Sequence, residues 1–281
     1  RERAQAELAV NGGPRTRTEP WPERGHVGEE EKRAVDALFD ETIATGRAFG
    51  YGGPAEEAFC RQFADFMGGG YADAVSSGSS AIYVALRSLE IEPFTEVIVS
   101  PITDPGGIMP IALLNCIPVV ADAEPGRYNT GPEQVEELIS PLTSAIVVAH
   151  IGGEPVDVAA IAAIGARHGV PVVEDCAQAH GATLNGRLVG SFGDVAAFST
   201  MSGKHFNTGA QGGVVYTRDE AIHMLSRRAS DRGKPHFLPE GSGNQFASLN
   251  MNLNDLAAAI GQVQLRKLPE IVERRRALVD N

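Results

Sequence analysis

The sequence has few cysteines, no excess of positive charge and no long apolar segment. Its three cysteines (Cys60, Cys116 and Cys176) are an odd number without close spacing, which argues against a disulfide framework or a metal site such as zinc. No apolar run reaches the roughly 18 residues that a membrane helix needs. A formal net charge of −12 argues against a broad surface for nucleic acid or anionic membrane. Reduced cysteines are typical of the cytoplasm, so we expect a cytoplasmic protein.

Short apolar runs alternate with stretches of helical periodicity along most of the 281 residues. Runs rich in Val and Ile, such as 96–100, 145–149 and 170–174, are typical of buried strands, and 79–89 and 156–168 of helices. Repeated strand–helix units predict an α/β fold, a three-layer sandwich with a mostly parallel central sheet. Ligands of such sheets bind at the carboxyl ends of the strands, so polar residues that follow strands are the functional candidates.

The chain divides into three parts by composition. Residues 1–28 are rich in Pro, Gly, Arg and Glu and are expected to form an N-terminal arm. Residues 29–270 are expected to form one large domain. Residues 271–281 continue a charged helical pattern that has no stop signal at Asn281, so we expect further sequence to follow this helix.

The first candidate motif is a run of small polar residues, 76–81, between a predicted strand and a predicted helix. Glycine at 78 lets the backbone approach an anion, and the helix start offers free N–H groups. The hydroxyls of Ser79 and Ser80 add further donors. This pattern suits a phosphate group, although a Ser/Gly turn before a helix more often only caps that helix.

The second and third motifs place an acid and a lysine after strands. Asp175 ends a fully apolar run, where a carboxylate can keep a pyridinium nitrogen protonated or simply cap the next turn. Lys204 follows the strand end at Ser199 by five residues. A loop lysine is usually solvated, but one near strand ends can form a Schiff base if its pKa is lowered. The glycine-rich stretch 208–213 then predicts a turn into a hairpin or edge strand beside the lysine.

The order of these motifs is more informative than any one of them. A phosphate-binding turn, an acid and a lysine 29 residues after the acid are similar to the large domain of fold-type I pyridoxal-phosphate (PLP) enzymes. The chain resembles the DegT/DnrJ/EryC1/StrS family of sugar aminotransferases from about Leu8 to its end. The resemblance is carried mainly by 174–182 (EDCAQAHGA), 190–199 (GSFGDVAAFS) and 253–276.

The resemblance implies a role for each matching residue. Lys204 would bind PLP covalently and act as the acid–base catalyst, and Asp175 would pair with the pyridine nitrogen. Gln178 would lie near the 3-oxygen of the ring. The phosphate would be bound by the turn at Gly78 and by three hydroxyls, those of Ser79, Ser80 and Ser199.

The resemblance also implies a homodimer, because the family takes one phosphate ligand from the partner subunit. The matching stretch here leaves two candidates open, Asn250 and Asn252. The implied reaction moves an amino group from glutamate or glutamine to a keto-sugar or keto-cyclitol, with pyridoxamine phosphate as the intermediate form of the cofactor. His180 and His205 are candidates for substrate contact.

Three features depart from the family's pattern. Asp104 stands where an aromatic residue usually stacks on the cofactor ring, which makes it a further candidate for substrate contact. The loop 209–213 reads GAQGG instead of the usual GEGG. Finally, the small C-terminal domain that completes the fold in the family, and to which the helix at 271–281 would lead, is absent from this sequence. These departures indicate an outlying branch of the family.

Three alternatives compete with an aminotransferase. Sugar dehydratases that use pyridoxamine phosphate share the fold, but they carry histidine in place of the lysine, so Lys204 argues against that reaction. A non-catalytic regulatory relative is compatible with Asp104 but not favoured by the intact acid and lysine. A dinucleotide-binding enzyme is disfavoured because the first strand–helix turn lacks the G-x-G-x-x-G pattern.

Overall fold

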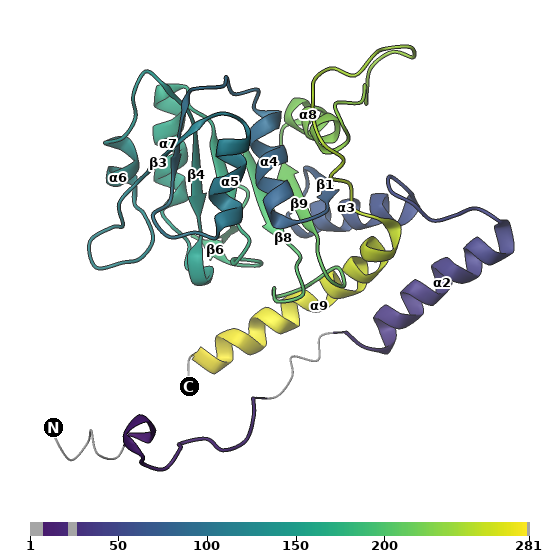
Figure 1. Cartoon of the computed structure of the whole chain (residues 1–281), viewed down its shortest axis with the longest axis horizontal. Helices are drawn as coiled ribbons and strands as arrows, with labels where there is room; N and C mark the ends of the chain where they lie inside the picture. Colours follow the sequence, from purple (N-terminus) through teal and green to yellow (C-terminus); the bar gives the residue numbers. More distant parts are fainter. Residues whose placement is uncertain (1–7, 22–26, 280–281) are drawn as a thin grey trace.

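Figure 1 shows the computed structural model of the chain, in which residues 8–21 and 27–279 are described. A seven-stranded sheet forms the centre, in the order β1-β9-β8-β5-β4-β2-β3. Its strands are β1 (Tyr71–Val75), β2 (Glu96–Val99), β3 (Ile117–Val120), β4 (Thr143–Ala149), β5 (Val172–Asp175), β8 (Val195–Ser199) and β9 (Gly213–Thr217). Strands β8, β5, β4, β2 and β3 run parallel, and β9 is antiparallel to both of its neighbours.

The helices surround this sheet. They are α2 (Glu29–Thr45), α3 (Pro54–Phe66), α4 (Gly78–Ser88), α5 (Pro105–Leu113), α6 (Pro132–Glu136), α7 (Val158–His168), α8 (Glu220–Ser230) and α9 (Asp255–Val279). Short 3-10 turns occur at Ala9–Asn11 and Ile151–Gly153. Strands β6 (Thr183–Leu184) and β7 (Arg187–Leu188) form a separate two-stranded hairpin. None of the described helices is long and apolar enough to cross a bilayer.

Both faces of the sheet are covered by helices. Successive strand residues point to opposite sides of the sheet, so one strand contributes side chains to a core on each face. In β2, Val97 and Val99 belong to a core shared with α4, whereas Ile98 packs into a core shared with α6 and α7. A third core joins β1, β8 and β9 to α3 and α9 and contains Phe59 and Phe63. This arrangement confirms the predicted three-layer α/β sandwich with a mostly parallel sheet.

Several details differ from the sequence-based expectations. The stretch after 208–213 forms β9, which makes the predicted antiparallel hairpin with β8 but also pairs with β1, so it is an interior strand and not an edge strand. Helix α6 ends at Glu136, whereas the sequence pattern predicts a helix around 132–139. Helix α8 and the β6–β7 hairpin were not predicted. Helix α8 was missed because it carries few large apolar residues and buries the small polar Ser226 and Ser230 instead.

The two ends of the chain are only partly described. Of the proposed arm, residues 1–7 and 22–26 lie outside the described part, and the rest is exposed apart from Gly13. Helix α9 runs without a break across residue 270, with Pro269 inside it, and packs against α2 and α3 (Figure 1). Residues 271–279, proposed as the start of a helix leading to a further domain, therefore continue α9, and residues 280–281 lie outside the described part.

Candidate active site

A cavity of about 270 Å³ lies where β5 and β8 end and where α4 and α5 begin. It gathers six of the residues singled out in the sequence, which come from four separate segments of the chain. These are Gly78, Ser79, Asp104, Asp175, Ser199 and Lys204. The rest of its lining includes Ser77, Gly107 and Gln211.

One end of the cavity is formed by the first turn of α4. The Ser77 hydroxyl accepts a hydrogen bond from the Ser80 backbone at 3.0 Å and so caps the helix. A Cβ atom on Gly78 would come within 2.7 Å of the Ser199 Cβ, so only glycine lets this turn lie against the end of β8. Helix N-termini carry free N–H groups and a partial positive charge, which suits an anion here.

Ser80 differs from the neighbouring Ser79, which lines the cavity. Its hydroxyl is hydrogen-bonded to the hydroxyls of Ser76 and Ser77, at 3.0 and 2.9 Å, and it is not part of the cavity lining. In this structure Ser80 therefore supports the turn instead of facing the space beside it.

Asp175 is buried at the end of β5, with 8% of its surface exposed. Its Oδ1 accepts a hydrogen bond from the Ala177 backbone at 3.0 Å, while Oδ2 has no hydrogen-bond partner within the described chain. Burial raises the pKa of this carboxyl, against the opposing effects of that hydrogen bond and of nearby positive charge. A cation placed at Oδ2 would offset the cost of burying the charge.

Lys204 lies in the loop between β8 and β9, and its side chain is half-buried. Its backbone N–H donates to the Met201 carbonyl at 2.9 Å, which fixes the turn that carries it. Its amine makes no ion pair with the acids of the described residues. Lys204 and Asp175 thus share one cavity without being paired to each other.

A buried pair that the sequence did not reveal supports this strand end. Glu174 is fully buried and accepts hydrogen bonds from the His150 ring at 3.1 Å and from the backbones of Gly190, Phe192 and Gly193. Burial raises the pKa of Glu174, but these hydrogen bonds outweigh it and lower the pKa overall. Residues 24 positions apart gave no local signal that could have predicted this pair.

His150 and Glu174 also lie near Cys176, close enough together to hold a metal ion. However, the His150 Nδ1 already accepts a hydrogen bond from the Val156 backbone at 3.2 Å, so its Nε2 carries the proton that Glu174 accepts. Both ring nitrogens are therefore occupied, which favours a structural role for this cluster.

Asp104 lies at the mouth of the cavity and is exposed. Its Oδ1 accepts a hydrogen bond from the Gly106 backbone at 2.8 Å and caps α5. Helix α5 approaches α4 closely, since a Cβ atom on Gly106 would come within 2.3 Å of the Ser79 Oγ. Two helix N-termini therefore converge on this cavity, a feature that the sequence did not predict.

Three predicted residues line a neighbouring cavity instead, and they are Gln178, His180 and His205. The Gln178 Oε1 accepts a hydrogen bond from the Gly152 backbone at 2.9 Å, which fixes its amide. Ala177 and Lys204 line the first cavity while Gln178 and His205, next to them in the chain, line the second. The two cavities thus share these two segments as walls.

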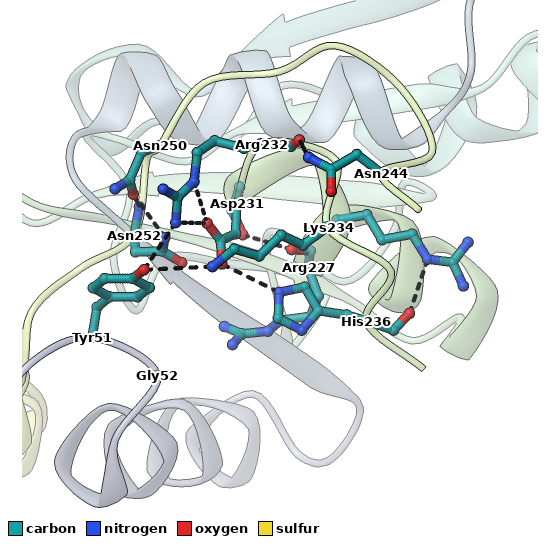
Figure 2. Close-up of polar contacts among 12 residues, drawn as sticks. Tyr51, Gly52, Arg227, Asp231, Arg232, Lys234, His236, Asn244, Asn250 and Asn252 are labelled. Atoms are coloured by element: carbon teal, nitrogen blue, oxygen red, sulfur yellow. Dashed lines mark hydrogen bonds and ion pairs between the residues drawn. The ribbon is translucent and has the colours of Figure 1, made fainter. Parts of the chain in front are cut away.

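The two predicted asparagines lie outside the cavity of their own chain. Figure 2 shows Asn250 and Asn252 beside a cluster of charged residues around Asp231, and the Asn252 amide donates to the Asn250 Oδ1 at 2.8 Å. Asp231 accepts hydrogen bonds from Arg232 and Lys234, at 2.8 and 2.7 Å. Burial raises the pKa of Asp231, but these partners outweigh it and hold the pKa at about 2.

The central sheet and its surrounding helices have the fold of solved aminotransferase structures. The chain belongs to the DegT/DnrJ/EryC1/StrS aminotransferase family, whose sequence profile matches residues 28–281. It is 35% identical to the L-glutamine:2-deoxy-scyllo-inosose aminotransferase of Streptoalloteichus tenebrarius, over 94% of this chain and 64% of that protein. The chain therefore spans less than two thirds of the length of this relative.

Solved structures agree with this family. The aminotransferase TlmJ from Streptoalloteichus hindustanus superposes with a TM-score of 0.81 at 34% identity, covering 90% of this chain and 68% of that one. NtdA from Bacillus subtilis, solved with bound cofactor PMP, gives a TM-score of 0.77 at 25% identity, covering 86% and 54%.

Proposed function

We propose that the protein of which this chain forms part is a PLP-dependent aminotransferase. It would move an amino group from glutamine or glutamate to a keto-sugar or keto-cyclitol. One observation carries the proposal, namely that Lys204, Asp175 and the N-terminus of α4 line a single cavity. Named relatives that use L-glutamine and a cyclitol ketone support the choice of substrates.

The donor groups of the cavity fit this cofactor. The N–H groups of the first turn of α4, with the hydroxyls of Ser79 and Ser199, suit a phosphate dianion. The unpartnered Oδ2 of Asp175 suits a protonated ring nitrogen, which would also stabilise the buried carboxylate. When bound, PLP supplies an electron sink and carries the amino group as pyridoxamine phosphate.

Three residues of the protein would then have separate roles in the reaction. Lys204 would anchor the cofactor and, once released, move a proton from the donor Cα, a contribution of about 10²–10⁴-fold for acid–base catalysis. Asp175 would hold a proton at the ring nitrogen. Gln178, whose amide is fixed by Gly152, would approach the ring oxygen from the neighbouring cavity that it lines.

We propose a homodimer as the working unit. Asn250 is exposed and Asn252 is half-buried, and neither lines the cavity of its own chain, so both are available to a partner subunit's phosphate site. The three cysteines are free thiols, which suits a reducing cytoplasmic location.

Covalent trapping of the cofactor tests this function. The chain is incubated with PLP, reduced with borohydride, digested and analysed by mass spectrometry. We expect the cofactor mass on Lys204 and its loss in Lys204→Ala. Lys32→Ala is the matched control, because Lys32 is exposed and paired with Asp36 away from the cavity. A wild-type chain without label on Lys204 would overturn the proposal.

A further inference from the structure

The second cavity measures about 490 Å³ and lies beside the proposed cofactor site. Its walls come from the segment 178–182, from His205, from the glycines of the turn after β4 and from the last turns of α9. None of the described residues that line it is acidic. The polar residues that line it are Gln178, His180, His205, Arg275 and Arg276.

His180 forms the buried floor of this cavity. It is 3% exposed and packs between Phe198 and Phe206, with ring centroids 5.7 and 5.2 Å away. Neither ring nitrogen makes a well-formed hydrogen bond within the described part of the chain, although the Ser199 backbone is close enough to favour protonation. Burial and the neighbouring charges of His205 and Lys204 lower the pKa of His180 to about 3. A neutral imidazole thus offers one donor and one acceptor to whatever fills the cavity.

The positive charge of the cavity comes from two of three consecutive arginines on α9. Arg276 is held at the wall by a hydrogen bond from its Nη2 to the Gly181 carbonyl at 3.1 Å. Arg275 also lines the cavity and makes no ion pair among the described residues. Arg274, in contrast, does not line the cavity and pairs with Glu270 at 3.1 Å on the solvent side of the helix.

We infer that this second cavity binds the carboxylate of the amino donor, with Arg275 and Arg276 as its anchors and His180 and Gln178 contacting the rest of the molecule. The inference rests on the proposed function and extends it to a donor subsite that the sequence motifs did not indicate. Arg275 and Arg276 would be substrate-binding residues and would not contact the cofactor phosphate.

The chemistry of the two substrates favours the donor as the ligand of the arginines. An α-amino acid carries a carboxylate, whereas a keto-cyclitol, or a keto-sugar without a phosphate group, offers only hydroxyl groups and a carbonyl. Guanidinium groups recognise carboxylates through charge-assisted hydrogen bonds, often two at once. The neutral His180 and the Gln178 amide suit hydroxyls and carboxamides equally well, so the same cavity could serve the acceptor after the donor has left.

Isothermal titration of the PLP-loaded chain with L-glutamine tests this subsite, with L-glutaminol as the matched ligand that lacks the carboxylate. We expect glutaminol to bind at least about tenfold more weakly, as the loss of one charge-assisted hydrogen bond implies. Arg275→Gln and Arg276→Gln should each weaken glutamine binding by about tenfold or more and leave glutaminol binding unchanged. Arg274→Gln is the control and should bind glutamine like the wild type.

The outcomes separate this inference from the proposed function. If Arg275→Gln and Arg276→Gln bind glutamine like the wild type, or if glutamine and glutaminol bind alike, the donor subsite is wrong. PLP loading at Lys204 would still support the aminotransferase. If inorganic phosphate competes with glutamine but the carboxylate makes no difference, the arginines serve an acceptor phosphate and the donor assignment fails. If the wild-type chain does not load PLP at Lys204, the proposed function itself fails.

Discussion

At the scale of single residues, Asp175 illustrates how a site can cost stability. Its pKa is raised by burial, so the carboxylate in the chain without cofactor is unfavourable at neutral pH. A raised folded-state pKa means that this group favours the folded state most at low pH. Its contribution becomes unfavourable as pH rises from the unfolded value of 3.8 through the folded value.

We therefore expect Asp175→Asn to stabilise the cofactor-free chain and to impair the reaction. The amide keeps the shape and removes the buried charge, so the free energy of unfolding at pH 7 should rise by about 1 kcal/mol. The glutamine half-reaction should slow by about 10²-fold or more, because the ring nitrogen loses its counter-charge. Urea unfolding at pH 7 and stopped-flow absorbance check the two effects. A less stable variant would contradict this account of the burial cost.

The predicted site residues that line the first cavity share one physical property. Asp175 and Ser199 end apolar strands, and Lys204 follows one closely, so their place at the sheet edge follows from the fold alone. Gln178 and His180 also follow β5, yet they line the second cavity together with Ala179, because Ala177 is the last residue of this segment that lines the first cavity. The Glu174–His150 pair depends on the register of two neighbouring strands, which sequence periodicity does not determine.

At the scale of elements, helix α5 carries the residue that departs most from the family's pattern. Asp104 caps α5 through the Gly106 backbone, so the unexpected acid has a structural role as well as a place at the cavity mouth. We expect Asp104→Ala to lower the free energy of unfolding by about 1 kcal/mol. Asp104→Asn keeps a capping oxygen, so its free energy of unfolding should fall by less than that of Asp104→Ala. Thermal unfolding of both variants checks this, and equal losses would show that the cap contributes nothing.

The contact between helices α2 and α9 implies that stability depends on pH. Glu31 is buried at the start of α2 and accepts hydrogen bonds from Gln264 and Lys267 of α9, at 2.8 and 2.6 Å. Burial raises the pKa of Glu31, but these bonds and one from Gly28 outweigh it and bring the pKa to about 2. Because the folded-state pKa is lowered, the stabilisation is present above pH 4.5 and is lost as pH falls toward 2.

Glu31→Gln should therefore remove roughly 1–3 kcal/mol of unfolding free energy at pH 7 and much less near pH 2. Chemical denaturation of wild type and variant across this pH range measures the difference. Glu29→Gln is the matched control, since Glu29 lies in the same helical turn but is exposed. A difference between wild type and variant that does not change with pH would exclude the charged contact as its cause.

The strands and helices were predictable to different degrees for related reasons. Strands buried on both faces gave continuous Val and Ile runs, and their positions agree with the structure to within about two residues. Helix α8 gave no such signal, because its fully buried residues are all small, namely Ser226, Ala229 and Ser230. The antiparallel pairing of β9 with β1 joins segments more than a hundred residues apart, so the sequence could not show that β9 is interior.

At the scale of the whole molecule, the proposed dimer makes each site depend on two chains. Lys204 would act in its own subunit, whereas Asn250 or Asn252 would reach the partner's phosphate site. The buried Asp231 and its cationic neighbours hold the segment that carries both asparagines (Figure 2). Two inactive variants, one changed at Lys204 and the other at the asparagines, should therefore restore activity when they form a mixed dimer. One site of that dimer combines an intact lysine from one subunit with intact asparagines from the other.

We expect Lys204→Ala and the double variant Asn250→Ala/Asn252→Ala each to show little activity in the glutamine half-reaction. Equal amounts of the two, unfolded and refolded together, should recover about a quarter of the wild-type sites, because half of the dimers are mixed and each mixed dimer has one complete site. Mixtures of each variant with wild type, unfolded and refolded in the same way, are the controls that measure subunit exchange and the yield of refolding. Activity in the mixture no higher than that of the separate variants would mean that the asparagines act within their own chain, and the site would then be complete in a monomer.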